Sequence, residues 1–169
     1  MSPDNFMRKI IFLRHGHSPS AAEAGVGRDE LRPLSERGKA AAATAAKKLA
    51  GKGYKPGLIL CSPLVRAKAT AEIAAAALGA PVEDVRELDG GHPCEDLWSA
   101  VRAGLERTDT VMAVGHQPSL GIVAGGLLGL SHFPFQPAGF AVLAFGGCVP
   151  DGIRPGCAKD EYLLFDPEL

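Results

Sequence analysis

The stretch Ile10-Ile11-Phe12-Leu13-Arg14-His15-Gly16 changes from apolar to polar in a single step. Its four apolar residues are typical of a strand that is buried on both faces of a parallel sheet. Arg14 and His15 follow directly, where the strand is expected to end. Open α/β sheets place their ligands at the carboxyl ends of their strands. We therefore predict a buried strand over Arg8–Leu13, with a polar site at its end.

The residue types after this strand suit chemistry on a phosphate. A histidine can attack phosphorus or exchange a proton near neutral pH. An arginine offers a planar fork that matches phosphate oxygens. A glycine lets the backbone turn and approach a ligand closely. Arg14, His15 and Gly16 are therefore expected to contact the substrate.

Three further segments accompany this one along residues 8 to about 130. They are Arg32-Pro33-Leu34-Ser35-Glu36-Arg37-Gly38, Cys61-Ser62-Pro63-Leu64-Val65-Arg66-Ala67 and Ala113-Val114-Gly115-His116. In this order, the four segments resemble the motifs of the histidine phosphatase superfamily, which includes the phosphoglycerate mutases. The short chain and its first helix-opening segment are most similar to the SixA-type phosphohistidine phosphatases. The resemblance implies a phosphoglycerate mutase-like fold.

The resemblance also implies roles for individual residues. His15 would be the nucleophile and would carry a covalent phosphoryl group, while Arg14, Arg66 and His116 would bind the phosphoryl oxygens. Independently, the ends of parallel strands share one edge of a sheet, so these four residues can converge. We expect two arginines and a cationic histidine to supply positive charge, and a backbone carbonyl to set the tautomer of His15.

Length and composition limit the function. The chain has 169 residues, with 18 basic and 19 acidic side chains and a net charge of −1. We expect one histidine phosphatase domain over residues 1–169. No long basic run favours nucleic acid or an anionic membrane as a partner. The four cysteines lack close zinc-ligand spacing, and no secretory pattern occurs, so we expect a cytoplasmic protein.

The order of the predicted elements gives the fold class. Strands are expected at Leu58–Cys61, Val82–Leu88, Thr110–Val114, Phe140–Phe145 and Glu161–Phe165. Helices are expected at Ser35–Ala50, Pro63–Leu78, Glu95–Arg107 and Pro118–Leu130. Their alternation predicts a three-layer α/β/α sandwich with a mostly parallel mixed sheet. Ser18–Leu34 is expected to be a loop, and its unusual length is typical of functional loops.

Two further features leave alternatives open. His17 is either a substrate contact or an ordinary loop histidine. His15 and His17, together with His92 and His116, could also build an all-histidine metal site. No His-Glu-x-x-His motif occurs. Because two arginines and a histidine can supply the charge of a metal, we expect no metal and no cofactor.

The general acid is less clear. Mutase-like members of the superfamily protonate an alkoxide leaving group with a carboxyl group from a loop. The corresponding segment here, Glu87–Asp96, offers Asp89 and Glu95 without a clear match. The SixA-type branch resembles this chain in lacking an evident acid. Imidazole, the leaving group of phosphohistidine, needs such an acid far less than an alkoxide does.

These patterns predict a phosphatase that works through a phosphohistidine on His15, with a phosphohistidine protein as its substrate. Two alternatives stay open. One is a small-molecule phosphomonoesterase of the same superfamily, and the other is a non-catalytic phosphate-binding domain. Neither the natural substrate nor the oligomeric state can be read from the sequence.

Overall fold

The structure is a computed structural model that describes residues 7–168. The strands are β1 (Arg8–Arg14), β2 (Leu58–Cys61), β3 (Val82–Asp84), β4 (Thr110–Gly115), β5 (Phe140–Phe145) and β6 (Lys159–Leu164). The α-helices are α1 (Ala21–Ala24), α2 (Glu36–Gly51), α3 (Val65–Leu78), α4 (Cys94–Gly104) and α5 (Ser119–Leu128). Two short 3-10 helices are η1 (Asp29–Leu31) and η2 (Arg86–Leu88).

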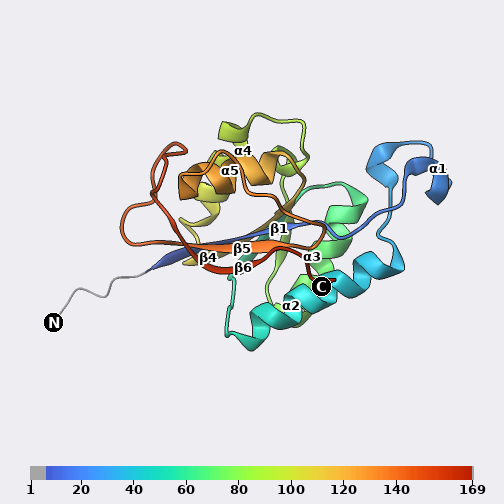
Figure 1. Cartoon of the computed structure of the whole chain (residues 1–169), viewed down its shortest axis with the longest axis horizontal. Helices are drawn as coiled ribbons and strands as arrows, with labels where there is room; N and C mark the ends of the chain where they lie inside the picture. The colour runs from blue at the N-terminus through green and yellow to red at the C-terminus, as the bar shows by residue number, and fades with distance from the viewer. Residues whose placement is uncertain (1–6, 169) are drawn as a thin grey trace.

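The strands form one sheet in the order β3-β2-β4-β1-β5-β6. The first four of these strands run parallel to one another, while β5 is antiparallel to β1 and β6 is antiparallel to β5. Helices α2 and α3 cover one face of the sheet, and α4 and α5 cover the other (Figure 1). This arrangement confirms the predicted three-layer α/β/α sandwich with a mostly parallel mixed sheet.

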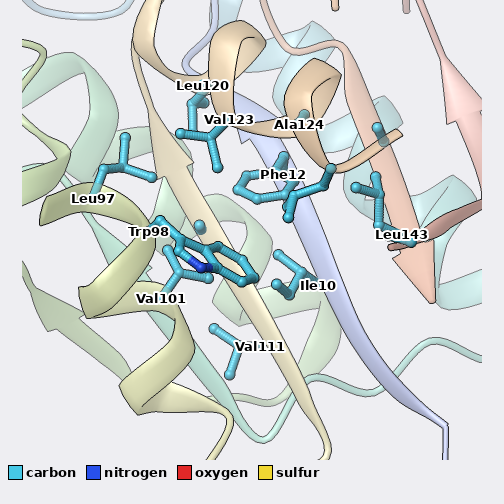
Figure 2. Packing of buried hydrophobic residues seen from close by; sticks show 14 of the residues in the cluster. Ile10, Phe12, Leu97, Trp98, Val101, Val111, Leu120, Val123, Ala124 and Leu143 are labelled. Atoms are coloured by element: carbon cyan, nitrogen blue, oxygen red, sulfur yellow. The ribbon is translucent and has the colours of Figure 1, made fainter. Parts of the chain in front are cut away.

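Strand β1 lies at the centre of both halves of the core. Successive side chains of a strand point to opposite faces. Ile10 and Phe12 therefore pack with Trp98 on the side of α4 and α5, as Figure 2 shows. Ile11 and Leu13 pack on the side of α2 and α3. All four residues of the apolar run are completely buried, as the sequence pattern predicts for a central strand.

Two predicted elements differ from the structure at their ends. Pro63 was expected to open a helix, but this helix begins at Val65, with Leu64 at its N-cap. Ser62, which precedes Pro63, contacts His116 through its hydroxyl group. The strand predicted over Val82–Leu88 ends early, and its second half forms η2.

The long segment between β1 and α2 was expected to be a loop, but the structure shows helices in it. It contains α1 and η1, and α1 projects beyond the end of the sheet (Figure 1). Ser20 and Glu23 form a reciprocal capping box that stabilises α1. Among the helices of residues 7–168, none has both the length and the apolar character needed to cross a membrane.

Gly16 was expected to approach a ligand, but its close neighbour is the backbone of α2. A Cβ atom at Gly16 would lie 2.6 Å from the carbonyl oxygen of Gly38. Likewise, a Cβ atom at Gly38 would collide with the backbone of His17. The pair of glycines therefore allows the residues that follow β1 to pack directly against the start of α2.

This contact makes Gly38→Ala a test of the fold around the site. We expect the variant to lose about 1–3 kcal/mol of unfolding free energy, because overpacking forces the backbone to shift. Gly51→Ala is the matched control, since no atom lies within 4 Å of a Cβ atom there and the residue ends the same helix. Urea denaturation measures both changes. Equal stability of the two variants would contradict the packing argument.

Candidate active site

The register of two parallel strands brings the predicted site residues together. Arg14 of β1 lies opposite Gly115 of β4. The backbone N–H of His15 donates to the Gly115 carbonyl over 3.1 Å. His15 and His116 are consequently neighbours, and their ring centroids are 4.9 Å apart. The convergence expected at the carboxyl edge of the sheet is therefore present for this pair.

A cavity opens at this edge of the sheet. Its lining comes from the ends of β1 and β4, the start of α3 and the loops around them. The lining residues are Arg14, His15, Asp29, Arg32, Leu64, Arg66, Asp89, Gly90, His116 and Gln117. All four residues that were expected to carry the chemistry thus share one cavity.

A backbone carbonyl sets the tautomer of His15, as expected. Its Nδ1 atom lies 2.7 Å from the carbonyl oxygen of Gly16. A carbonyl can only accept a hydrogen bond, so Nδ1 carries the proton and donates it. In the neutral ring, Nε2 then holds an unshared electron pair. This nitrogen is the one able to attack phosphorus.

Both arginines are held at one end of the guanidinium. Nη1 of Arg14 donates to the carbonyl of Phe135 over 2.9 Å. Arg66 donates from Nη1 to the carbonyl of Asp29 over 2.9 Å and from Nη2 to its carboxylate over 3.0 Å. The Nε atoms of both arginines are buried without a hydrogen-bond partner among the described residues.

Unpaired buried donors of this kind are costly for a fold. Two of them on neighbouring cations, beside a histidine with an unshared electron pair, indicate a site for an anion with several oxygens. Phosphoryl oxygens match the fork geometry of arginine.

The site keeps its histidines neutral, which corrects the expectation of a cationic histidine. Burial lowers the pKa of His15 to about 3, and His116, Arg66 and Arg14 add to this effect, although the Gly16 carbonyl opposes it. Burial, and then the charge of Arg66, lowers the pKa of His116 to about 4. Near neutral pH, the two histidines carry no charge, so the positive charge of this cluster comes from Arg14 and Arg66 alone.

Ser62 at the end of β2 holds the second histidine. Its Oγ atom lies 2.7 Å from Nε2 of His116 and accepts the backbone N–H of Leu64 over 3.2 Å. The hydroxyl thus couples the orientation of the imidazole to the start of α3.

Other predicted residues lie elsewhere. Nδ1 of His17 lies 2.7 Å from Oγ of Ser35, the cap of α2, and the described lining of the cavity does not include His17. His92 contacts the carboxylate of Asp89 at 2.9 Å. Of the two candidate acids, Asp89 lines the cavity, whereas the described lining does not include Glu95.

Sequence reasoning missed three lining residues, Asp29, Arg32 and Gln117. Asp29 and Arg32 come from the long segment between β1 and α2. Its length was the only signal for Asp29, whereas Arg32 opens the family-like motif Arg32–Gly38 but was given no role. Gln117 follows His116 directly, and its side chain bonds to the backbone of Phe133 and Gly121. No local pattern distinguishes Asp29 and Gln117 from ordinary surface residues.

The described residues hold no group of three or more His, Cys, Asp or Glu side chains that could bind a metal ion. The two histidines of the proposed all-histidine metal site that lie outside the cavity lining, His17 and His92, instead contact Ser35 and Asp89.

Comparison with known proteins places the chain in a family. The model of the histidine phosphatase superfamily (branch 1) matches residues 10–101. An uncharacterized protein of Picosynechococcus is 36% identical over 169 residues, which cover 95% of this chain and 97% of that protein. A 2,3-bisphosphoglycerate-dependent phosphoglycerate mutase of Gloeothece citriformis is 45% identical over 98 residues, covering 54% of this chain and 39% of the mutase.

Solved structures agree with this placement. A SixA protein from Nakamurella multipartitia superposes with a TM-score of 0.78 at 25% identity, covering 95% of this chain and 96% of that one. A SixA protein from Agrobacterium tumefaciens has a TM-score of 0.75 at 27% identity, with coverages of 93% and 97%. The protein histidine phosphatase SixA complexed with tungstate shares the fold, with a TM-score of 0.80 at 21% identity and coverages of 94% and 97%.

The fold and the cavity with two histidines and two arginines thus define a phosphatase of the histidine type. The chain belongs to the histidine phosphatase superfamily.

The neutral histidines predict how stability depends on pH. Both have folded pKa values, about 3 and about 4, below the value of about 6.5 in an unfolded chain. At pH values between the folded and the unfolded pKa, the two imidazoles bind protons in the unfolded chain but not in the folded chain. Their contribution to stability is therefore complete above pH ~6.5 and declines as the pH falls toward about 4.

Urea denaturation at several pH values between 7 and 4 measures this decline. His116→Asn should flatten the slope, because it removes one of the two groups. His132→Asn, which removes an exposed histidine, is the matched control and should leave the slope unchanged. An unchanged slope in His116→Asn would show that this imidazole is not held neutral.

Proposed function

We propose that this phosphatase works through a covalent phosphohistidine on His15 and that its substrate is a phosphohistidine protein. In the first step, Nε2 of His15 attacks phosphorus, the new N–P bond forms, and the bond to the leaving group breaks. In the second step, water attacks the phosphohistidine, releases orthophosphate and restores the imidazole. The supporting observation is the hydrogen bond from Nδ1 to the Gly16 carbonyl, which leaves Nε2 unprotonated.

Charge supports the roles of the neighbouring residues. The transition state of phosphoryl transfer spreads negative charge over the non-bridging oxygens. The guanidinium groups of Arg14 and Arg66, which both line the cavity, suit these oxygens. His116 lies beside His15 and is proposed to contact the same oxygens. Because a bound anion favours the charged form of a nearby imidazole, His116 can take up a proton together with the substrate.

The state of Asp89 supports phosphohistidine as the substrate. Burial opposes its ionisation, but hydrogen bonds from His92 and from the N–H of Gly91 hold the pKa of this carboxyl below its ordinary value. An ionised carboxylate cannot protonate a leaving group. Imidazole leaves without a strong acid, so the cavity suits phosphohistidine better than an alkyl ester. The SixA proteins that match nearly the whole chain are consistent with this substrate.

One observation favours a small-molecule phosphomonoesterase as the second candidate. Half of the chain resembles a phosphoglycerate mutase at 45% identity. Asp89 also places one carboxyl group in the cavity, where an acid for an ester would be needed.

The nucleophile is tested by His15→Ala. We expect the variant to lose turnover of an aryl phosphate and of a phosphohistidine peptide by more than about a thousandfold, because the covalent route is lost. A thermal melt checks that the variant remains folded. A second check is acid-labile labelling of the wild-type chain by radioactive substrate, which should disappear in the variant. A folded variant with nearly wild-type rates would remove His15 from the mechanism.

The substrate is tested by comparing leaving groups. General acid help is worth about a hundred- to ten-thousandfold, so without it kcat/KM should be much higher for phosphohistidine and aryl phosphates than for a simple alkyl phosphate. Asp89→Asn should preserve this ranking. Glu95→Gln is the matched control, because it alters a carboxylate of the same segment that is absent from the described cavity lining.

A different result would favour the second candidate. If alkyl phosphates are hydrolysed as fast as phosphohistidine, and Asp89→Asn alone removes that activity, Asp89 acts as an acid. The chain would then be a small-molecule phosphomonoesterase.

A further inference from the structure

We propose that Asp29 is a positioning residue, which orients the guanidinium of Arg66 toward the phosphoryl group. The inference rests on the proposed role of Arg66 in phosphoryl binding. It gives a function to the long segment between β1 and α2, which the mechanism above does not use.

Asp29 holds Arg66 through two different atoms. Its backbone carbonyl accepts from Nη1, and its carboxylate accepts from Nη2. The side chain of Arg66 is only 8% exposed. Arginine has many rotamers, so a contact at both terminal nitrogens removes much of this freedom before a ligand arrives. Arg66 lines the cavity, and the remaining N–H donors of its terminal nitrogens are left for the phosphoryl oxygens.

Arg32 in turn fixes Asp29. Its Nη1 donates to Oδ1 of Asp29 over 2.9 Å, so the two carboxylate oxygens serve different arginines. The Nε and Nη2 atoms of Arg32 donate to the carbonyls of Pro19 and Ser18 over 2.7 and 3.1 Å. Arg32 thereby connects the start of the segment, at Ser18 and Pro19, to Asp29 near its end. The position of Asp29 consequently depends on the whole segment and not on one flexible side chain.

Arg14 provides a parallel within the same cavity. One terminal nitrogen of its guanidinium is held by the Phe135 carbonyl, and its Nε is also buried without a described partner. Both arginines are therefore anchored at one end and left with an unpaired Nε. The repetition indicates a common design, in which protein oxygens orient each fork and leave donors for the ligand.

The opposite role for Asp29 has to be considered, because a carboxylate near Arg66 could compete with the phosphoryl group. A competitor would have to leave when the substrate binds. Rotation of the Asp29 side chain would free only Nη2 of Arg66, since the backbone carbonyl of Asp29 also holds Nη1. Hydrogen bonds from Arg32 and then from Arg66 hold the pKa of Asp29 below its ordinary value despite some burial, so the carboxylate that accepts from these arginines is the charged form.

The two roles predict opposite effects of Asp29→Ala. As a positioning residue, Asp29 should support turnover, and its loss should lower kcat/KM for an aryl phosphate about ten- to a hundredfold. Inhibition by inorganic phosphate should weaken as well. Asp29→Asn keeps the backbone carbonyl and one side-chain oxygen as acceptors but replaces the other oxygen with an NH2 group, so it should recover part of the loss. Stronger phosphate inhibition in Asp29→Ala would show a competitor and overturn the proposal.

Asp84→Asn is the matched control. Asp84 pairs with Lys68 of the same helix, α3, at 3.0 Å, which equals the Arg66–Asp29 carboxylate distance. The described cavity lining does not include this pair. We expect kcat/KM of this variant to stay within about twofold of wild type, as for other surface pairs. Equal losses in Asp84→Asn and Asp29→Asn would reduce the effect to general helix stability and overturn the proposal.

A double-mutant cycle identifies the route of the effect. If Asp29 acts through Arg66, Asp29→Ala should cost much less in an Arg66→Lys background, because lysine has no fork to orient. Full additivity would overturn the positioning role. If Arg66→Lys alone keeps wild-type kcat/KM, the proposed phosphoryl-binding role of Arg66 fails, and the role of Asp29 fails with it. A loss in Arg66→Lys together with unchanged kcat/KM in Asp29→Ala overturns only the positioning role.

Discussion

The hydrogen bond between the His15 N–H and the Gly115 carbonyl fixes the geometry on which the site depends. It continues the parallel ladder of β1 and β4 by one residue, so that the first residues after both strands emerge at the same level. A slip of one residue would turn each side chain to the opposite face. The completely buried run from Ile10 to Leu13 prevents this slip, because its side chains fill the core on both faces. Core packing therefore determines where His15 lies.

The connections that follow β1 and β4 explain why the cavity opens at this edge of the sheet. The chain leaves β1 toward α2 on one face of the sheet and leaves β4 toward α5 on the other. Between such strands the connecting segments separate and leave a crevice at the carboxyl edge. Helix α3 begins beside this crevice and brings Arg66. The Gly16–Gly38 contact brings the start of α2 against the backbone after β1.

The same packing creates the electrostatic character of the site. Burial brings two arginines next to two imidazoles and removes the water that would stabilise extra charge. The arginines remain charged, whereas both imidazoles become neutral. Protein oxygens satisfy one end of each guanidinium and leave a buried Nε without a described partner. Natural folds accept such unsatisfied groups mainly at functional sites, where a ligand supplies the missing partner.

Local chemistry in the sequence was enough to predict much of the fold. The apolar run before Arg14 predicted β1, and Ser35 predicted the start of α2. The expected end of α3 at Leu78 is also observed, and Gly79 follows it in a left-handed conformation. One difference lies where a side chain has a distant partner. Serine is a residue type that often caps helices, but the hydroxyl of Ser62 contacts His116, which is 54 residues away in the chain. A local pattern contains no information on such a partner.

The sequence by itself determined which residues could carry the chemistry, because polar residues directly after buried parallel strands must meet at one edge of the sheet. Only the tertiary structure decided their states. The neutrality of His15 and His116 results from burial and from the charge of Arg66, which comes from a different segment. The contact of Asp29 with Arg66 spans 37 residues. Protonation and orientation depend on distances between such segments, and these distances exist only after the chain has folded.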